Sequence, residues 1–469
     1  MAEIHSSQGS GKTLHAGLST RQVTMISIAG IIGAGLFIGS SKAIATAGPA
    51  ILISYAFTGL LVLVVMRMLG EMAVSQPDTG SFSTYADRAI GRWAGFSIGW
   101  LYWWYWVLVI PVEAIAGADI LSTWFPTVPA WLFSSGIVFL LTFTNLFSVK
   151  NFGEFEFWFS IVKVVAIIGF IVLGALAVTG KLPTADISGV EKLWAFNGFM
   201  PNGFGAVIGG VLVTVFSFFG AEIVSIAAAE SRNPEEQIAR ATRLVVYRIA
   251  LFYILSIFLV VAIVPWNDPR LMEVGSFQRA LEIMHIPGAK FVVDVVVLIA
   301  VCSCMNSGLY TSSRMLFALG RRGDAPAATC TTSEAGVPRV AVISSTVAGF
   351  LGCLANYFFP GQVFSILLST TGAFGLVLYL VIAFTQLRMR RQMNLRGEVP
   401  KLKMWLYPYL TWFTIIVIAG ILGYMFVSAT YRYEALMTAG VTLFVLIASL
   451  IVTNKRKAGV TERRVNKAH

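Results

Sequence analysis

Among the ionisable side chains inside long apolar stretches of the sequence, three stand out: Glu113, Lys163 and Glu222. Ionisable residues are costly in segments that cross a membrane, and they mark substrate and ion pathways there. Lys163 is either a structural cation, paired with a carboxylate or backbone carbonyls, or a group that replaces a coupling ion by gaining and losing a proton. Glu222 is either a hydrogen-bonded strut or a proton-sensitive gate. Glu113 either shapes a pocket or forms an ion pair inside a helix bundle.

A glycine-rich stretch, Gly30 to Gly39, holds four glycines in ten residues. Each glycine destabilises a helix interior by roughly 1 kcal/mol relative to Ala, so this density requires a reason. One reason is close packing of helices through small residues. The other is a helix that is broken in the middle of the membrane. In that case the freed N–H groups near Gly33, Ala34 and Gly35 can bind a carboxylate.

A second interruption is predicted between Phe216 and Glu222, where a glycine and a carboxylate stand near the middle of another apolar segment. Paired broken helices at corresponding positions of two halves indicate the binding site of a secondary transporter. Freed N–H groups can take a carboxylate and freed carbonyls can take an ammonium. We therefore expect the two breaks to bind a zwitterion, namely a small amino acid.

A polar stripe and an aromatic run have simpler interpretations. Ser303, Asn306 and Ser307 recur at helical spacing, which favours interhelical hydrogen bonds of about 0.6–2 kcal/mol each. Ser303 and Ser307 are also candidate pocket residues. The aromatic run from Trp100 to Trp106 is expected to be an interfacial or packing cluster, and Glu71 is expected to be structural.

The sequence contains neither metal-ligand spacing nor a nucleophilic triad, and its four histidines fall outside the apolar stretches. We therefore expect no metal, no cofactor and no enzymatic activity. The net charge of +11 does not indicate nucleic-acid binding, because Lys and Arg cluster in short segments between apolar stretches rather than on one phosphate-binding face.

Twelve apolar segments must position these residues. Apolar residues make up 57% of the chain and charged residues 12%, about half the charged share of a soluble domain. Each segment has about 20 residues or more, enough to cross ~30 Å of hydrocarbon. The segments lie near 23–46, 49–73, 93–123, 130–148, 154–178, 204–228, 243–265, 289–317, 339–358, 363–387, 405–428 and 434–453. The prediction is an all-α membrane protein in contact with lipid.

The distribution of basic residues predicts the orientation. Most of the 34 Lys and Arg residues fall in the tails and in alternate connections, and cytoplasmic segments carry this excess. We expect cytoplasmic tails at 1–22 and 454–469 and insertion in the bacterial inner membrane. The connection 74–92 is long, and it is expected to form a short helix against the cytoplasmic mouth.

The two breaks divide the chain into halves. Residues 23–178 hold five segments and residues 204–387 hold the next five. Five is an odd number, so the second half must cross the membrane upside down relative to the first. The segments at 405–453 then lie outside this inverted repeat.

Three motifs resemble the amino acid/polyamine/organocation superfamily and, within it, the amino acid transporter branch: Gly30 to Gly39, Pro77 to Ala86, and Phe216 to Glu222 followed by Glu230. Longer stretches are similar to bacterial γ-aminobutyrate permeases: Asp78 to Trp106, Val149 to Trp158, Gly198 to Ala206 and Met404 to Pro408. The resemblance extends from about Arg21 to about Arg456.

The resemblance implies a LeuT-type fold and proton-coupled uptake of γ-aminobutyrate or a close ω-amino acid, with the protein expected to be a monomer. Lys163 corresponds to the helix-five lysine of proton-coupled relatives, Glu222 shares in proton coupling, and Phe216 is the expected gate. The expected substrate-binding residues are Ile31, Gly33, Ala34, Gly35, Phe216, Phe219 and Glu222. Alternatives are a permease for proline or an aromatic amino acid, and a sensor that binds an amino acid without transport.

Overall fold

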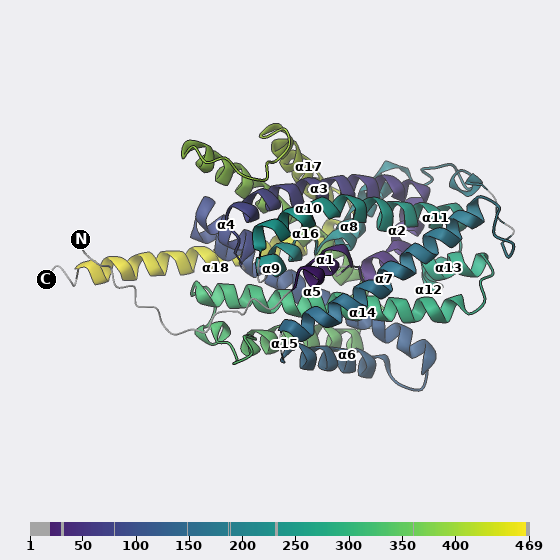
Figure 1. The fold of residues 1–469 in the computed structure, drawn as a ribbon, viewed down its shortest axis with the longest axis horizontal. Coiled ribbons are helices and arrows are strands. Elements are labelled where there is room, and N and C mark those ends of the chain that lie inside the picture. The colour runs from purple at the N-terminus through teal and green to yellow at the C-terminus, as the bar shows by residue number, and fades with distance from the viewer. Residues whose placement is uncertain are drawn as a thin grey trace.

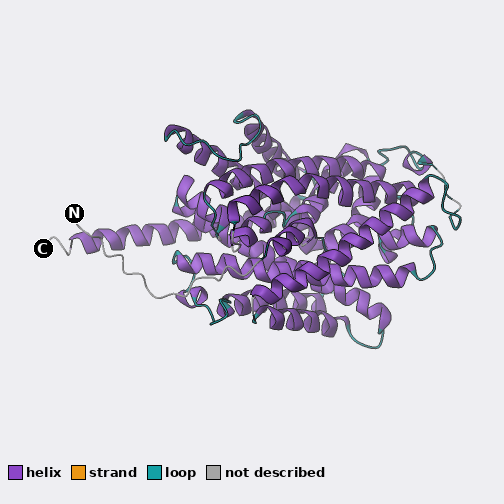
Figure 2. Cartoon of the chain, in the orientation of Figure 1, coloured by secondary structure: helices purple, strands orange, loops and turns teal. Residues whose placement is uncertain are grey.

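The computed structural model describes residues 19–465, except for 30, 31, 79, 148, 186, 188, 230–232 and 360. The described part of the chain is helical and contains no strand (Figure 2). Backbone N–H and C=O groups have no water to bind in hydrocarbon, so a chain this apolar satisfies them within helices.

The helices up to residue 178 are α1 (Thr20–Ala29), η1 (Gly35–Gly39), α2 (Ser40–Ala47), η2 (Gly48–Ala50), α3 (Ile51–Ser75), α4 (Ser81–Ala89), α5 (Arg92–Trp124), α6 (Ala130–Asn145) and α7 (Val149–Val178). The later helices are η3 (Glu191–Leu193), α8 (Gly203–Phe218), α9 (Ile223–Ala229), α10 (Pro234–Arg248), η4 (Ile249–Leu255), α11 (Ser256–Ile263), α12 (Leu271–Val274), α13 (Ser276–Ile283), α14 (Ala289–Arg321), η5 (Ala327–Cys330), α15 (Arg339–Phe358), α16 (Val363–Leu395), α17 (Tyr409–Val427) and α18 (Arg432–Val465).

Within the described residues, nine helical stretches are long and apolar enough to cross a membrane, and two shorter apolar helices accompany them. Each of the twelve predicted segments contains helix, and one continuous helical stretch from Gly35 to Ser75 joins the second part of the first segment to the second segment. The all-helical membrane class is therefore confirmed. The count of twelve spans and the inverted repeat stay predictions.

The long helices run side by side along the longest axis of the molecule (Figure 1). Short α4 lies at one end of this bundle, and α12 and α13 lie at the other. Large apolar side chains face outward along the bundle, as Phe413 on α17 and Phe444 on α18 do. Apolar surface of this extent marks contact with a membrane or with another protein.

Helix α5 is the central support of the bundle. It packs against α14, α6, α4, α16, α15 and α18. Pro111 lies inside it and removes one backbone hydrogen bond, and a Cβ on Gly352 of α15 would lie 2.5 Å from the Pro111 ring. A glycine is therefore needed where the two helices approach. Buried Glu113 lies two residues after this proline.

The short helix expected in the connection 74–92 is present as α4. Its Ser81 hydroxyl lies 2.7 Å from the Ser225 hydroxyl of α9, and its Phe82 ring meets the Tyr102 ring edge-on with centroids 4.7 Å apart. Helix α4 thus contacts α9, which follows the second predicted break, and Tyr102 of α5.

An ion-pair network holds α4 in this place. The Arg92 guanidinium donates to Asp324 Oδ1 at 2.8 Å, and Arg322 donates to the Ser83 hydroxyl of α4 at 2.6 Å. Burial raises the pKa of Asp324, and the charges of Arg92 and Arg322 oppose that rise. The network joins the connection after α14 to both α4 and α5.

Glu71 of α3 has the structural role expected from the sequence. Its carboxylate accepts from Arg390 at 2.6 Å, from the Gln386 amide at 2.8 Å and from the backbone N–H of Met404 at 2.7 Å. These contacts join α3, α16 and the connection that leads to α17.

We expect Glu71→Gln to lower the free energy of unfolding by roughly 3 kcal/mol, because loss of one partner leaves the other charge of a buried pair uncompensated. Denaturation in detergent measures this. The control is Glu398→Gln, whose partner Arg396 is 3.8 Å away on the exposed surface, and whose effect should be small. Equal effects of the two substitutions would contradict the prediction.

Candidate functional site

The first predicted break is present between α1 and η1. Helix α1 ends at Ala29, Ile32 and Gly33 are not helical, and helix resumes at Ala34. Gly30 and Ile31 lie outside the described residues, so the carbonyl expected from Ile31 is not described. The glycine-rich sequence thus interrupts a helix rather than only packing helices together.

The second break is present between α8 and α9. Phe219 is extended, with φ −63° and ψ 147°, and Gly220 has φ +102°, a conformation that side chains rarely allow. Helix resumes at Ile223. The glycine is therefore required by the backbone geometry of the break.

The two breaks lie against each other in the core. A Cβ on Gly35 would be 2.8 Å from the Ser217 backbone Cα and 3.0 Å from the Phe216 ring. Only hydrogen at position 35 permits this approach. Phe216, the expected gate, therefore lies beside the glycine-rich turn, and it is almost completely buried.

Glu113 lies at the predicted carboxylate site of the first break. Its Oε2 accepts a hydrogen bond from the Ala34 backbone N–H at 3.0 Å, and a Cβ on Gly33 would be 2.7 Å from Oε1. The sequence predicts this N–H for a bound carboxylate. In the structure a side-chain carboxylate from α5 fills that position, which the spacing of the residues did not indicate.

Glu222 is held at the second break by two donors. Its Oε2 accepts from the Gly220 N–H at 2.8 Å and its Oε1 from the Tyr102 hydroxyl at 3.0 Å. The carboxylate is completely buried. This geometry agrees with the interpretation as a strut, and it couples the break to α5.

The aromatic run of α5 surrounds Phe219. The Phe219 ring centroid is 4.0 Å from that of Tyr105, 5.1 Å from that of Tyr379 and 6.4 Å from that of Trp106. The aromatic residues of α5 form a packing cluster, as expected, but they pack against Phe219, which belongs to the second break. Sequence reasoning therefore missed Tyr102 and Tyr105 as site residues, although both face the side of α5 that carries Glu113.

We expect Tyr102→Phe to reduce substrate uptake about 10-fold, because loss of a donor to a buried carboxylate costs ~1–3 kcal/mol. Initial uptake rates in proteoliposomes measure this. Tyr247→Phe makes the same chemical change at a residue that is 71% exposed, and it should leave the rate unchanged. A Tyr102→Phe rate equal to that of the control would show that the hydroxyl is dispensable.

Lys163 connects the first break to α14. Its Nζ donates to the Ile32 carbonyl at 3.3 Å and to the Ser303 hydroxyl at 2.8 Å, and its side chain is completely buried. Ser307, the other candidate pocket residue, is buried one turn further along α14. Lys163 therefore touches both a carbonyl of the break and the polar stripe of α14.

Beside Lys163 and Ser303 lies another buried carboxylate, Glu156, which sequence reasoning missed. Glu156 is completely buried on α7. Its Oε2 accepts from the Ser303 hydroxyl and its Oε1 from the Asn306 amide, both at 2.8 Å. Asn306 is held in turn by Asn145 of α6 at 2.6 Å. The available signal was its spacing: residues 156 and 163 lie two turns apart on one helix face.

The described residues contain no group of three or more His, Cys, Asp or Glu that could hold a metal ion.

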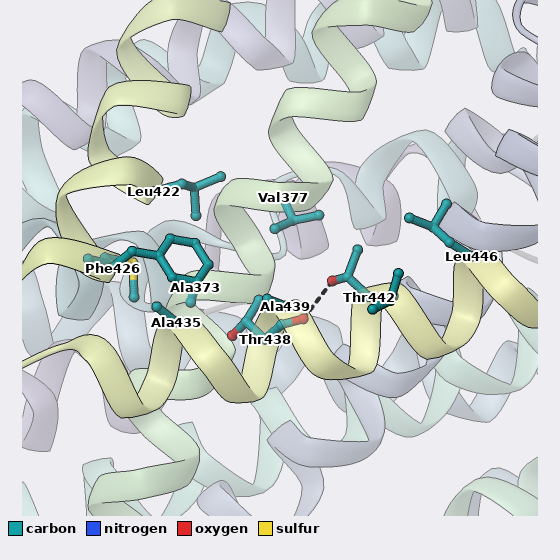
Figure 3. A pocket seen from close by; sticks show the side chains of 11 residues that line it. Ala373, Val377, Leu422, Phe426, Ala435, Thr438, Ala439, Thr442 and Leu446 are labelled. Carbon is teal, nitrogen blue, oxygen red and sulfur yellow. Dashed lines mark hydrogen bonds between the residues drawn. The ribbon is translucent and has the colours of Figure 1, made fainter.

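A separate cavity of about 220 Å³ lies between α16, α17 and α18 (Figure 3). Apolar side chains line most of it. The Thr442 hydroxyl donates a hydrogen bond to the Thr438 backbone carbonyl at 2.7 Å. This cavity has no charged group for a zwitterion, so the breaks are the better candidate site.

Comparisons with known proteins identify the family of the chain. The amino acid permease family matches residues 22–461. The chain is 58% identical to a probable GABA permease of Pseudomonas aeruginosa, over 95% of this chain and 94% of that protein. It is 54% identical to the gamma-aminobutyric acid permease of Escherichia coli, over 95% of both chains.

More distant relatives match the chain over almost its whole length. The aromatic amino acid transport protein AroP of Corynebacterium glutamicum is 36% identical, over 96% of this chain and 98% of that protein. A manganese transporter of Eremococcus coleocola superposes with a TM-score of 0.56 at 15% identity, over 93% of this chain and 94% of that chain. At this identity the likeness concerns the fold alone, which is that of LeuT-type transporters.

Proposed function

Because this chain belongs to the amino acid permease family, we propose that it imports γ-aminobutyrate into the bacterial cytoplasm in symport with protons. One observation carries the proposal: two interrupted helices meet inside a multi-pass membrane protein, with Gly35 against Ser217. Relatives that are 58% and 54% identical and named for γ-aminobutyrate support this substrate.

The substrate carboxylate binds the backbone N–H groups of Gly33, Ala34 and Gly35, at the start of a helix, where the N–H groups are free of helical partners. Since Glu113 accepts from the Ala34 N–H, the substrate carboxylate must displace the Glu113 side chain. The substrate ammonium binds carbonyls near Ile31, Phe216 and Phe219. Glu222 holds the second break in the shape that presents these carbonyls.

Lys163 carries the coupling proton. Its ammonium bonds the Ile32 carbonyl beside the first break, so a change in its charge alters the site directly. Movement of Phe216 opens the site as α1, α2, α3, α8, α9, α10 and α11 rock against the other helices. In this proposal the protein is a monomer of twelve spans with an inverted five-helix repeat.

The orientation follows from the basic segments. The end of the bundle that holds α4 faces the cytoplasm, and both termini are cytoplasmic, because Lys and Arg are concentrated in the corresponding connections. This places α12 and α13 on the periplasmic side of the inner membrane.

Uptake of labelled γ-aminobutyrate into proteoliposomes tests the proposal, with an inward proton gradient and no sodium. The expected result is accumulation above equilibrium that a protonophore abolishes. Lack of accumulation by folded protein would overturn this substrate. Binding without any transport would indicate a sensor.

A second candidate function is uptake of an aromatic amino acid, which the AroP relatives at 36% and 37% identity favour. Competition distinguishes the two. Excess unlabelled γ-aminobutyrate should suppress labelled uptake, whereas stronger suppression by tyrosine, phenylalanine or proline would reassign the substrate.

A further inference from the structure

Glu156 has no part in the function proposed above, yet it is a carboxylate buried completely in the protein. Two neutral donors, Ser303 and Asn306, bind it. Isolation of a carboxylate from water costs several kcal/mol unless a cation compensates it. The compensating cation is Lys163, which bonds the same Ser303 hydroxyl at 2.8 Å.

We propose that Glu156 shares the coupling proton with Lys163 through the Ser303 hydroxyl and relays it toward the cytoplasmic end of α7. The inference rests on the proton symport proposed above. It assigns the second member of the proton site, because Lys163 donates to Ser303 and Ser303 donates to Glu156 in one continuous chain.

The direction of the relay follows from the helix. Residues 156 and 163 are seven positions apart, which is about 10 Å along an α-helix. Helix α7 starts at Val149, after α5 has crossed away from the α4 end of the bundle and α6 has returned to it. Glu156 is therefore nearer to the cytoplasmic side than Lys163, while Lys163 touches the substrate break.

The transfer balances without any further reactant. A proton leaves the Lys163 ammonium for Ser303 Oγ as the Ser303 hydroxyl proton moves to Glu156 Oε2. The result is a neutral amine and a carboxylic acid, and the net charge of the pair does not change. Loss of the acid proton to the cytoplasm then leaves a carboxylate and a neutral amine, which can accept the next proton from the periplasmic side.

Among the side chains that the structure describes, few other titratable groups face this pair. Glu113 approaches from α5 and Cys304 from α14. At the start of α7, Glu154 pairs with Arg21 of α1, and Arg314 of α14 lies over the Tyr310 ring. Glu113 is the competing carboxylate, but its Oε2 bonds the Ala34 N–H, whereas Glu156 shares a hydroxyl with Lys163.

The first test compares wild type, Glu156→Gln and Ser303→Ala in proteoliposomes with labelled γ-aminobutyrate. Both variants should lose concentrative uptake at least ~10-fold, within the range of an ordinary coupling free energy, while exchange of internal for external substrate continues. Glu191→Gln is the matched control, because it neutralises an exposed carboxylate outside the bundle core, and it should accumulate substrate like wild type.

The outcomes separate the relay from a strut. Equal loss of exchange and accumulation, together with a lower melting temperature, would make Glu156 a structural link between α7 and α14 and overturn the relay. Full accumulation in Glu156→Gln would overturn it as well. Failure of wild type to accumulate γ-aminobutyrate would instead reject the proposed substrate.

A second test needs no substrate. Infrared difference spectra recorded during a pH titration should show in wild type a C=O band from the protonated carboxylic acid of Glu156, in addition to the bands of the other carboxyl groups. That band should disappear in Glu156→Gln and persist in Glu191→Gln. Identical spectra for wild type and Glu156→Gln would overturn the proposal whatever the protein transports.

Discussion

Replacement of Lys163 by Ala is expected to abolish proton-driven accumulation while exchange across the membrane continues. The Lys163 ammonium is the group that joins the Ile32 carbonyl of the first break to Ser303 of α14. Without an ionisable group at this position, no protonation step links substrate binding to the proton gradient. We expect accumulation to fall at least ~100-fold, near the upper limit of typical coupling between two sites.

The measurement is the steady-state ratio of internal to external substrate under an inward proton gradient, with counterflow exchange measured in parallel. Lys163→Met removes the charge and shortens the side chain by one atom only, so it separates the loss of the proton from the effect of the larger cavity that Ala leaves. Lys181→Ala, at an exposed position after α7, serves as the control. Full accumulation in both Lys163 variants would exclude a coupling role.

Replacement of Gly35 by Ala is expected to reduce uptake at least ~10-fold, because overpacking a tight contact costs about 1–3 kcal/mol. The added Cβ would lie 2.8 Å from the Ser217 Cα. That atom belongs to the backbone of α8 and cannot rotate away, so the two breaks must separate and the carbonyls near Phe216 must move.

Gly39→Ala is the matched comparison on the same stretch. Its Cβ would meet Val213 at 3.4 Å, an ordinary contact, so uptake should stay close to wild type. Initial rates at equal amounts of folded protein measure both variants. If Gly39→Ala were as inactive as Gly35→Ala, general helix packing rather than the contact between the breaks would explain the glycines.

Glu113 changes how the first break is understood. The sequence predicts N–H groups that are available to bind a ligand. In the structure, the Ala34 N–H instead donates a hydrogen bond to the Glu113 carboxylate. An anion bound at this position is consistent with the chemistry of the start of a helix. The position is therefore suited to a carboxylate, whether it comes from the protein or from the substrate.

The amino-acid sequence by itself determined the helices, the two breaks and three of the buried charged residues. Each is a local property: apolar length predicts a span, dense glycine or a glycine beside a carboxylate predicts an interruption, and a charge such as Lys163 inside an apolar run indicates function. Helix α4 is also predicted locally, from the length of the connection 74–92. These features need no knowledge of which helices are neighbours.

Tertiary structure alone decided which groups meet. The Ala34 N–H and the Glu113 carboxylate are 79 residues apart in the chain, and the Glu156 carboxylate and the Ser303 hydroxyl are 147 apart. Helical spacing relates only residues within a few turns of one another, so it carries no information about such pairs. For the same reason Tyr102 could be identified as aromatic and near other rings, but its bond to Glu222 depends on how α5 packs against the second break.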